Sequence, residues 1–221
     1  MSRPLAQAPD PARFYEKPAA AWIRATRPEL GDGSDLELVR VGLAAGMRLQ
    51  RFKRSQVLPR VRSILGILHG LSPSSLLDIG SGRGAFLWPL LETFPTLDVT
   101  AIDASPVRAE QLRAVASGGV STLRAHPMDA ASLAFEDRSF DVVTALEVLE
   151  HVPDFASAVR EIARVARRFV LVTVPSRPDD NPEHLHLLDT ATLQSAFMAA
   201  GALRVSFESI LNHRIVTVRL P

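Results

Sequence analysis

The feature that most constrains this chain is a glycine-rich loop that directly follows a short apolar run. The run is Leu76–Ile79, and the loop, Gly80–Gly84, reads Gly-Ser-Gly-Arg-Gly. Glycines let a backbone turn tightly and approach a ligand closely, and the helix expected from about Arg83 would direct its N-terminus at the same place. An apolar run, a glycine loop and a helix in this order indicate a nucleotide-cofactor site in an α/β fold.

The glycine spacing alone leaves two classes of cofactor open. The first two glycines and Ala85 fit the relaxed dinucleotide fingerprint, and Asp103 follows where a ribose-binding acid is expected. Two features favour S-adenosylmethionine over NAD: the early third glycine, Gly84, and the carboxylate of Asp78, which would repel a pyrophosphate. S-adenosylmethionine carries no phosphate, and its ammonium group requires an anionic or carbonyl-rich partner.

The composition predicts a single globular domain with an N-terminal extension. The chain has 221 residues, of which 47% are hydrophobic and 22% charged, enough for one substantial core. It contains no apolar run of membrane-spanning length and no apolar stretch of signal-peptide type at its start, so we expect a cytoplasmic protein with no membrane partner. Because it has no cysteine, only histidine, aspartate and glutamate remain as plausible metal ligands.

Basic residues concentrate in one part of the chain although the net charge is only +1. Between Leu38 and Leu77 there is no aspartate or glutamate. Two interpretations are open, a polyanion-binding face or a solvated helix face whose charges are balanced elsewhere in the fold. The basic residues of this stretch are Arg40, Arg48, Arg51, Lys53, Arg54, Arg60 and Arg62.

The N-terminal quarter of the chain predicts a helical cover rather than part of a sheet. The first 33 residues contain five prolines, which indicate an irregular arm with one short helix at Ala19–Arg27. Apolar residues at helical spacing then predict helices over Leu36–Phe52 and Val57–Leu68. We expect an N-terminal arm and helical cover over residues 1–56, and a cofactor-binding domain over residues 57–221.

From Ser75 onward, strand and helix patterns alternate, which predicts a three-layer, doubly wound α/β fold with a mostly parallel seven-stranded sheet. Five strands are predicted at Leu76–Ile79, Val99–Ile102, Thr122–Ala125, Phe140–Ala145 and Phe169–Val174. The helices between and after them are predicted at Ala85–Phe94, Pro106–Ala116, Phe155–Ala166 and Ala191–Ala200. Two final β-rich runs, Leu203–Ile210 and Arg214–Leu220, predict a hairpin that gives the sheet an antiparallel C-terminal strand.

Four motifs follow one another in a fixed order along the second part of the chain. They are the loop Leu76–Gly84, the acid Asp103 after the second strand, Met128–Ala130 after the third, and Phe140–Asp154, which contains Glu-Val-Leu-Glu-His-Val-Pro-Asp. With these motifs, residues 57–221 resemble the class I S-adenosylmethionine-dependent methyltransferases. The resemblance implies S-adenosyl-L-methionine as cofactor and S-adenosyl-L-homocysteine as product.

The resemblance also implies which residues bind the cofactor. Asp103 is expected to accept hydrogen bonds from both ribose hydroxyls, because one carboxylate can accept from two donors. Asp129 is expected to accept from the adenine amino group. The expected cofactor-binding residues are Asp78, Gly80, Ser81, Gly82, Gly84, Asp103, Ala104, Met128, Asp129, Ala130, Leu146 and Glu147.

One segment departs from the pattern of the resembled family. Its members often place a Pro-Gly-Gly turn before the fifth strand, whereas here Arg164–Arg168 runs directly into Phe169. The length of this connection is therefore open.

The expected function is methyl transfer from S-adenosylmethionine to a small-molecule acceptor, with oxygen as the expected nucleophile, by in-line displacement. His151 is the candidate catalytic base because it follows the fourth strand and histidine titrates near neutrality. The alternative role of His151 is a structural cap. Tyr15, Trp22 and the loop Pro175–Leu188 are expected to form walls of the acceptor pocket, although the two aromatic residues equally fit a core.

A metal-assisted alternative rests on Glu147, Glu150 and His151 taken with His184 or His186. Small-RNA 3′-terminal 2′-O-methyltransferases carry a Glu-x-x-Glu-His set and a later histidine that bind a divalent metal, and ubiquinone-pathway O-methyltransferases share a similar string. The competing interpretation is a loop whose acids cap the next helix, and we assign no metal ligand. RNA methylation and a non-catalytic S-adenosylmethionine-binding regulatory protein remain the alternative functions. The acceptor, the methylated atom, the pathway and the oligomeric state stay open.

Overall fold

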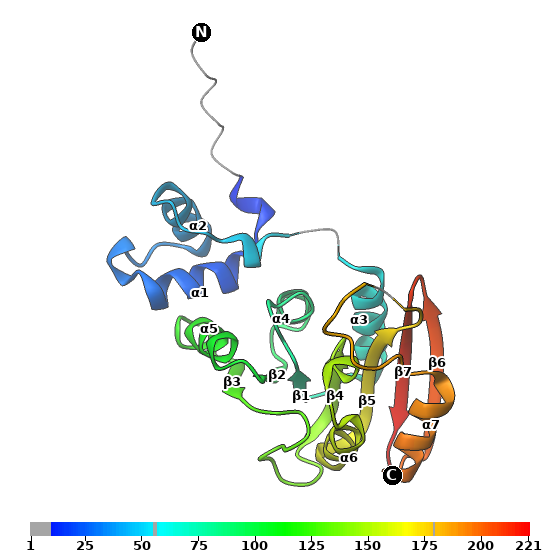
Figure 1. The fold of residues 1–221 in the computed structure, drawn as a ribbon. Helices are drawn as coiled ribbons and strands as arrows, with labels where there is room; N and C mark the ends of the chain where they lie inside the picture. The colour runs from blue at the N-terminus through cyan, green and yellow to red at the C-terminus, as the bar shows by residue number, and fades with distance from the viewer. Residues whose placement is uncertain (1–9, 55–56, 179) are drawn as a thin grey trace.

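The structure, a computed structural model, describes residues 10–54, 57–178 and 180–221 (Figure 1). Within these ranges a seven-stranded sheet has the strand order β3-β2-β1-β4-β5-β7-β6. Strands β1 to β5 pair in parallel, and β7 runs antiparallel between β5 and β6. This confirms the predicted sheet. The strands are β1 (Ser75–Ile79), β2 (Asp98–Asp103), β3 (Leu123–Pro127), β4 (Phe140–Leu146), β5 (Ala166–Pro175), β6 (Arg204–Ile210) and β7 (His213–Arg219).

Helices cover both faces of the sheet and complete the three layers. Buried apolar side chains of α3, α4 and α5 form one cluster with one face, and those of α6 and α7 form a second cluster with the other. In Figure 1, α1 and α2 lie outside the first helical layer, where α1 packs against α5 and α2 packs against α1. The helices are α1 (Glu16–Thr26), α2 (Asp35–Ala44), α3 (Pro59–Leu71), α4 (Leu87–Thr93), α5 (Pro106–Ser117), α6 (Phe155–Val165) and α7 (Thr190–Ala199). None of the described helices is long and apolar enough to cross a membrane.

The cover differs from its prediction at one helix. The helix expected over Leu36–Phe52 is divided, because α2 ends at Ala44 and a separate 3-10 helix, η3, spans Gln50–Phe52. Gly46 lies between them with a φ of 76°, a left-handed conformation that commonly ends helices. The domain boundary expected after residue 56 adjoins residues 55 and 56, which lie outside the described residues, so this division stays a prediction.

The connection left open before β5 contains no turn. Helix α6 ends at Val165 and β5 begins at the next residue, Ala166. Ala166 pairs with Phe140, but the following pair joins Val142 to Phe169, so β5 carries extra residues opposite β4. A β-bulge of this kind absorbs a local change in direction. It takes the place of the Pro-Gly-Gly turn.

The cover packs against the rest of the chain through a very close helix contact. Phe14, Ile23 and Phe52 of the cover belong to the same buried cluster as α3, α4 and α5. At the end of α5, Gly118 lies directly against the backbone of α1 at Ala21. A side chain at this position would push the cover away from the helices beneath it.

Replacing Gly118 with alanine should therefore disturb the contact between α1 and α5. A Cβ atom at Gly118 would lie 1.8 Å from the carbonyl oxygen of Ala21, and backbone cannot rotate aside as a side chain would. We expect Gly118→Ala to lower the free energy of unfolding by about 2 kcal/mol in urea titrations, as overpacking does. Gly66 in α3 has no atom within 4 Å of the same position, so Gly66→Ala should instead raise it by up to ~1 kcal/mol. Equal losses in both variants would contradict this packing.

Candidate active site

The predicted site residues gather at the carboxyl ends of four neighbouring parallel strands. The register places Ile79 of β1 beside Ile102 of β2 and Ala145 of β4, and Asp103 beside Pro127 of β3. Helices α4 and α5, which follow β1 and β2, cover one face, whereas α6, which follows β4, covers the other. The winding direction therefore reverses between β1 and β4. Open α/β sheets bind ligands at such a switch point.

The glycine loop needs its glycines for two different reasons. Gly80, Gly82 and Gly84 all have positive φ, at 68°, 55° and 85°, which strains any other residue. A Cβ atom would also lie 2.5 Å from Val148 at Gly80 and 2.1 Å from Trp88 at Gly84. At Gly82 it would meet only the carbonyl oxygen of Gly80, at 3.6 Å. Gly82 is thus the position at which the backbone is open to a ligand.

Asp78 is buried beneath this loop, with only 2% of its surface exposed. Its Oδ2 accepts a hydrogen bond from the hydroxyl of Ser81 at 2.6 Å, and its Oδ1 accepts one from the hydroxyl of Thr144 at 2.8 Å. Burial raises the pKa of the Asp78 carboxyl to about 6, against the opposing effect of these two hydrogen bonds. A bound cation would relieve this cost, because it favours the ionised carboxylate.

Asp103 joins the ends of two loops. Its Oδ2 accepts a hydrogen bond from the backbone N–H of Gly82 at 2.9 Å, and its Oδ1 accepts one from the N–H of Ser105 at 2.9 Å. The guanidinium of Arg108 lies 3.9 Å from Oδ2. The carboxylate is therefore held in one orientation beside the open backbone of Gly82.

Two adjoining cavities contain nearly all of the predicted site residues. The larger, of about 450 Å³, is called here the main cavity, and the smaller, of about 190 Å³, the loop cavity. They share Gly80 and Glu147 in their walls. The main cavity is also lined by Asp103, Ala104, Met128, Asp129, Ala130 and His151, and the loop cavity by Asp78, Ser81, Gly82 and Leu146. Gly84 lines neither of them and belongs to a third cavity beside the cover.

Arg60 lines the loop cavity and has no counterpart among the predicted site residues. It was noted only as part of the basic stretch, because nothing local in the sequence shows that α3 brings it to the glycine loop. Its Nε lies 3.8 Å from Oε1 of Glu147. The loop cavity therefore presents two acids, Asp78 and Glu147, and two bases, Arg60 and Arg83.

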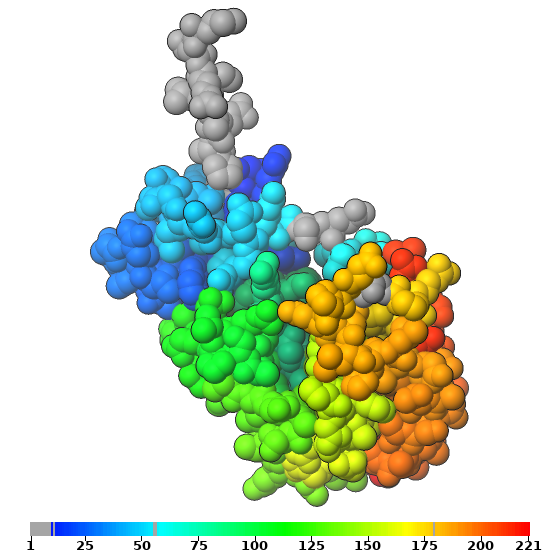
Figure 2. Space-filling model, in the orientation of Figure 1, coloured from blue at the N-terminus to red at the C-terminus, as the bar shows by residue number. Residues whose placement is uncertain are grey.

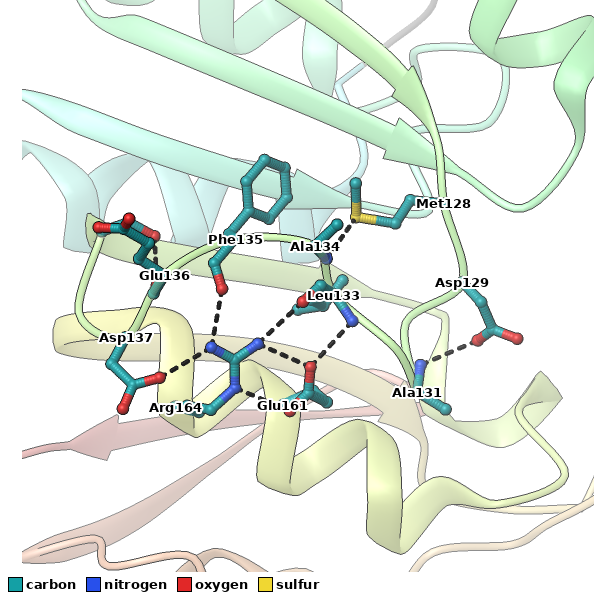
Figure 3. Close-up of polar contacts among 11 residues, drawn as sticks. Met128, Asp129, Ala131, Leu133, Ala134, Phe135, Glu136, Asp137, Glu161 and Arg164 are labelled. Atoms are coloured by element: carbon teal, nitrogen blue, oxygen red, sulfur yellow. Dashed lines mark hydrogen bonds and ion pairs between the residues drawn. The ribbon is translucent and has the colours of Figure 1, made fainter.

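The loop after β3, which carries Met128 and Asp129, is fixed from below by Arg164 of α6 (Figure 3). Arg164 donates to the carbonyl oxygens of Leu133 and Phe135 at 2.9 and 2.7 Å and pairs with Asp137 and Glu161, each at 2.8 Å. These carboxylates raise the pKa of the guanidinium. The carboxylate of Asp129 lies apart from this network in Figure 3 and accepts from the N–H of Ala131.

Glu147 is the most unusual residue of the site. Its φ of 57° is left-handed, which a glutamate adopts only when its surroundings impose it. Its Oε1 accepts a hydrogen bond from the hydroxyl of Thr173 at 2.7 Å, and its Oε2 lies 3.1 Å from Nε2 of His213. Thr173 and His213 come from β5 and β7. The sequence placed Glu147 at the site but gave no sign of these partners.

The structure brings together three of the residues considered as metal ligands and places the others apart from them. Glu150, His151 and His184 place candidate ligand atoms within 4.8 Å of one another, and Glu147 is outside this group. His186 is outside it as well, since its Nε2 lies 3.0 Å from the carbonyl oxygen of Val152. The two histidine rings of the group are 4.8 Å apart between centroids.

His151 lies on the wall of the main cavity, on the 3-10 helix η4 (Leu149–His151). Its Nδ1 is 2.9 Å from the carbonyl oxygen of Glu183. A carbonyl oxygen only accepts, so Nδ1 carries a proton, and in the neutral ring the lone pair is then on Nε2. Glu183 belongs to the loop after β5, and it lines the main cavity too. In Figure 2 the orange part of this loop lies on the surface of the molecule.

Comparison with known proteins defines the class of this site. Residues 77–170 match the family described as a methyltransferase domain. Solved structures with the same seven-stranded, Rossmann-like fold include methyltransferases, which confirms the resemblance seen in the sequence. The part of the chain that carries the glycine loop, Asp103, Asp129 and Glu147 thus matches a methyltransferase domain.

Individual relatives are similar over part of their length. The chain is 36% identical over 113 residues to the ubiquinone biosynthesis O-methyltransferase of Nitrosomonas europaea, covering 49% of this chain and 46% of that protein. It is 35% identical to the nocamycin O-methyltransferase of Saccharothrix syringae, covering 49% and 40%. The YcgJ protein of Bacillus subtilis superposes with a TM-score of 0.56 at 25% identity, covering 69% and 70%. The chain spans less than half the length of these two curated relatives.

Removing the guanidinium of Arg164 should loosen the loop that carries Met128 and Asp129. Hydrogen bonds to a charged group contribute roughly 1.5–3 kcal/mol each, but the side chain is 30% exposed, so water replaces part of this. We expect Arg164→Ala to reduce the free energy of unfolding by about 2 kcal/mol and to speed amide hydrogen exchange over residues 128–137. Arg160→Ala, on the same helix, is the control; the same exchange pattern in both variants would refute the role of Arg164.

Proposed function

We propose that this protein transfers the methyl group of S-adenosylmethionine to an oxygen atom of a small-molecule acceptor. The observation that carries the proposal is the pair of adjoining cavities at the switch point, with one acid for each polar part of the cofactor. The names of the curated relatives, which are O-methyltransferases, support oxygen as the methylated atom. The acceptor itself stays open.

The main cavity suits the adenosine part of the cofactor. Asp103 is already oriented by two backbone donors, so its remaining lone pairs would accept from the vicinal ribose hydroxyls. Asp129 lines the same cavity, as do Met128 and Ala130, and would accept from the adenine amino group. In this proposal Asp103 would bind the ribose and Asp129 the adenine, the roles expected for them from the sequence.

The loop cavity suits the amino-acid part. Asp78 would face the ammonium group, and the raised pKa of this buried carboxyl is the cost that such a cation would offset. Arg60 would pair with the carboxylate of the same amino acid. Glu147, in the wall shared by both cavities, would stand where the two parts of the cofactor meet.

Methyl transfer needs alignment and a place for a proton. Bound S-adenosylmethionine supplies a methyl group activated on a sulfonium. His151 lines the main cavity with the lone pair of Nε2 available for the proton of an acceptor hydroxyl, while its Nδ1 is held by Glu183. We propose His151 as this base.

The alternative functions have less support. The basic stretch does not form one face, since Arg54 pairs with Glu92 and Arg60 lines the loop cavity. RNA methylation is therefore not favoured. Metal binding at Glu150, His151 and His184 stays a hypothesis, and so do a purely regulatory role, the oligomeric state and the cytoplasmic location.

Cofactor choice can be tested by thermal unfolding with S-adenosylhomocysteine or NADH added separately. We expect the melting temperature to rise with S-adenosylhomocysteine alone. Asp103→Asn should weaken its binding by roughly 2 kcal/mol, about 30-fold in Kd, because the charge that accepts from the ribose is lost. Asp98→Asn, at the opposite end of the same strand, is the matched control and should bind normally. A shift with NADH alone would overturn the proposal.

The raised pKa of Asp78 predicts a pH dependence of cofactor binding. The carboxyl ionises as the pH rises through about 6, and only the ionised form attracts the ammonium group. S-adenosylhomocysteine should therefore bind roughly tenfold more weakly at about pH 5 than at about pH 7.5. Calorimetry on Asp78→Asn should show weaker binding without this step. If the affinity of Asp78→Asn changed with pH by the same factor, the pH dependence would belong to another titrating group.

The same group affects the stability of the empty protein with the opposite sign. Its folded pKa lies above its unfolded value of 3.8, so its favourable contribution to folding is fully present below pH 3.8 and is lost as the pH rises through about 6.

A further inference from the structure

A third cavity lies between the cover and the glycine loop. Its volume is about 200 Å³, and three basic residues line it: Arg51 and Lys53 from the cover, and Arg83 from the loop. No aspartate or glutamate is in its lining. It is called here the basic cavity. Leu58, Arg83 and Ala85 belong to its wall and also to that of the loop cavity, so the two cavities are neighbours.

The charges of the basic cavity are not balanced within the described part of the chain. Arg51, Lys53 and Arg83 form none of the ion pairs found there, whereas the adjacent Arg54 makes a two-point pair with Glu92. Burial, and after it the charge of Arg83, lower the pKa of the Arg51 guanidinium. The two guanidinium groups are therefore close enough to repel each other. An anion between them would remove this repulsion.

One of the basic groups, that of Arg51, is also held in place before any ligand arrives. The guanidinium of Arg51 lies 4.9 Å from the ring centroid of Trp22 and donates a hydrogen bond to Gln111. The indole N–H of Trp88 donates to the carbonyl oxygens of Arg51 and Arg83, each at 3.0 Å. Trp88 thus joins the backbones of the cover and the loop at the floor of the cavity. A preorganised arrangement loses little entropy on binding.

We propose that the basic cavity binds an anionic group of the methyl acceptor, a carboxylate or a phosphate monoester. The nucleophilic oxygen of that acceptor would pass Leu58 and Ala85 and reach the wall at Glu147 that the loop cavity shares with the main cavity, which His151 lines. This inference rests on the proposed function. The cavity has room for one small group rather than for a nucleic acid strand. Arg40, Arg48 and Arg62, the other basic residues of the same stretch, do not line it. The site would therefore select small acidic acceptors.

Binding of simple anions to the full chain, with S-adenosylhomocysteine present, tests this inference. The probes are phenyl phosphate and benzoate, with phenol as the uncharged control, titrated by calorimetry. Trp22 and Trp88 both contact Arg51 and are the two tryptophans of the chain, so their fluorescence gives a second readout. We expect saturable binding of at least one anion and none of phenol. The probe that binds with the higher affinity shows whether the site prefers a phosphate or a carboxylate.

The variant to compare is Lys53→Gln with Arg83→Gln, because both residues are exposed and neither holds another element in place. We expect it to bind the anion at least tenfold more weakly. Arg48→Gln, an exposed residue of the same cover outside the cavity, loses one charge and should bind as the unchanged protein does. Arg51 is left intact because it supports the packing of Trp22.

Three results would overturn the inference. The first is equal anion binding in the Lys53/Arg83 variant and in Arg48→Gln, or no saturable binding of either probe. The second is loss of S-adenosylhomocysteine binding in the Lys53/Arg83 variant without loss of anion binding, which would assign the cations to the cofactor. The third is binding of a single-stranded RNA oligonucleotide that Arg48→Gln weakens equally. Failure of the unchanged protein to bind S-adenosylhomocysteine would instead contradict the proposed function and leave the anion result to stand by itself.

Discussion

The site depends on one buried carboxylate in the middle of the sheet. Asp78 accepts hydrogen bonds from Ser81 in the glycine loop and from Thr144 on β4. A buried carboxylate is costly unless it is hydrogen-bonded, so both hydroxyls are required where they are. The loop is thereby fixed to β4, and its Gly82 N–H is brought to the carboxylate of Asp103 on β2. Three strands and the loop are thus joined through two acids.

Much of this site could be predicted from the sequence because its residues occupy strand ends. Apolar runs and loops set the order of the strands, and parallel strands bring their carboxyl ends to one edge. The position of Asp103 follows from this logic, and the roles of Asp103 and Asp129 were implied by the family resemblance. The partners of Glu147 do not, since Thr173 and His213 reach it only through the position of β5 and β7 in the sheet. Contacts made by sheet order leave no local pattern in the sequence.

The sequence also did not show the packing around the glycines or the point at which a helix of the cover ends. The sequence explained the glycines by the approach of a ligand, whereas Val148 and Trp88 occupy the space at Gly80 and Gly84. Helical spacing of apolar residues continued past Gly46, where the helix in fact ends. Periodicity reports which face of a segment is buried, but it says little about a single backbone angle. The sequence also gave no indication that Arg60 and Arg83 line the same cavity, because they belong to different elements.

The acids of the site and most cations of the basic cavity come from different segments of the chain. The acids Asp78, Asp103 and Asp129 all lie in the segment that matches the methyltransferase domain, residues 77–170. Arg51 and Lys53 lie before it, in the cover. Two cations nevertheless share a cavity wall with an acid, because Arg60 and Arg83 line the loop cavity together with Asp78. The domain match thus includes the acids proposed to hold the cofactor and Arg83, whereas the other two cations of the basic cavity, Arg51 and Lys53, lie in the cover outside the match.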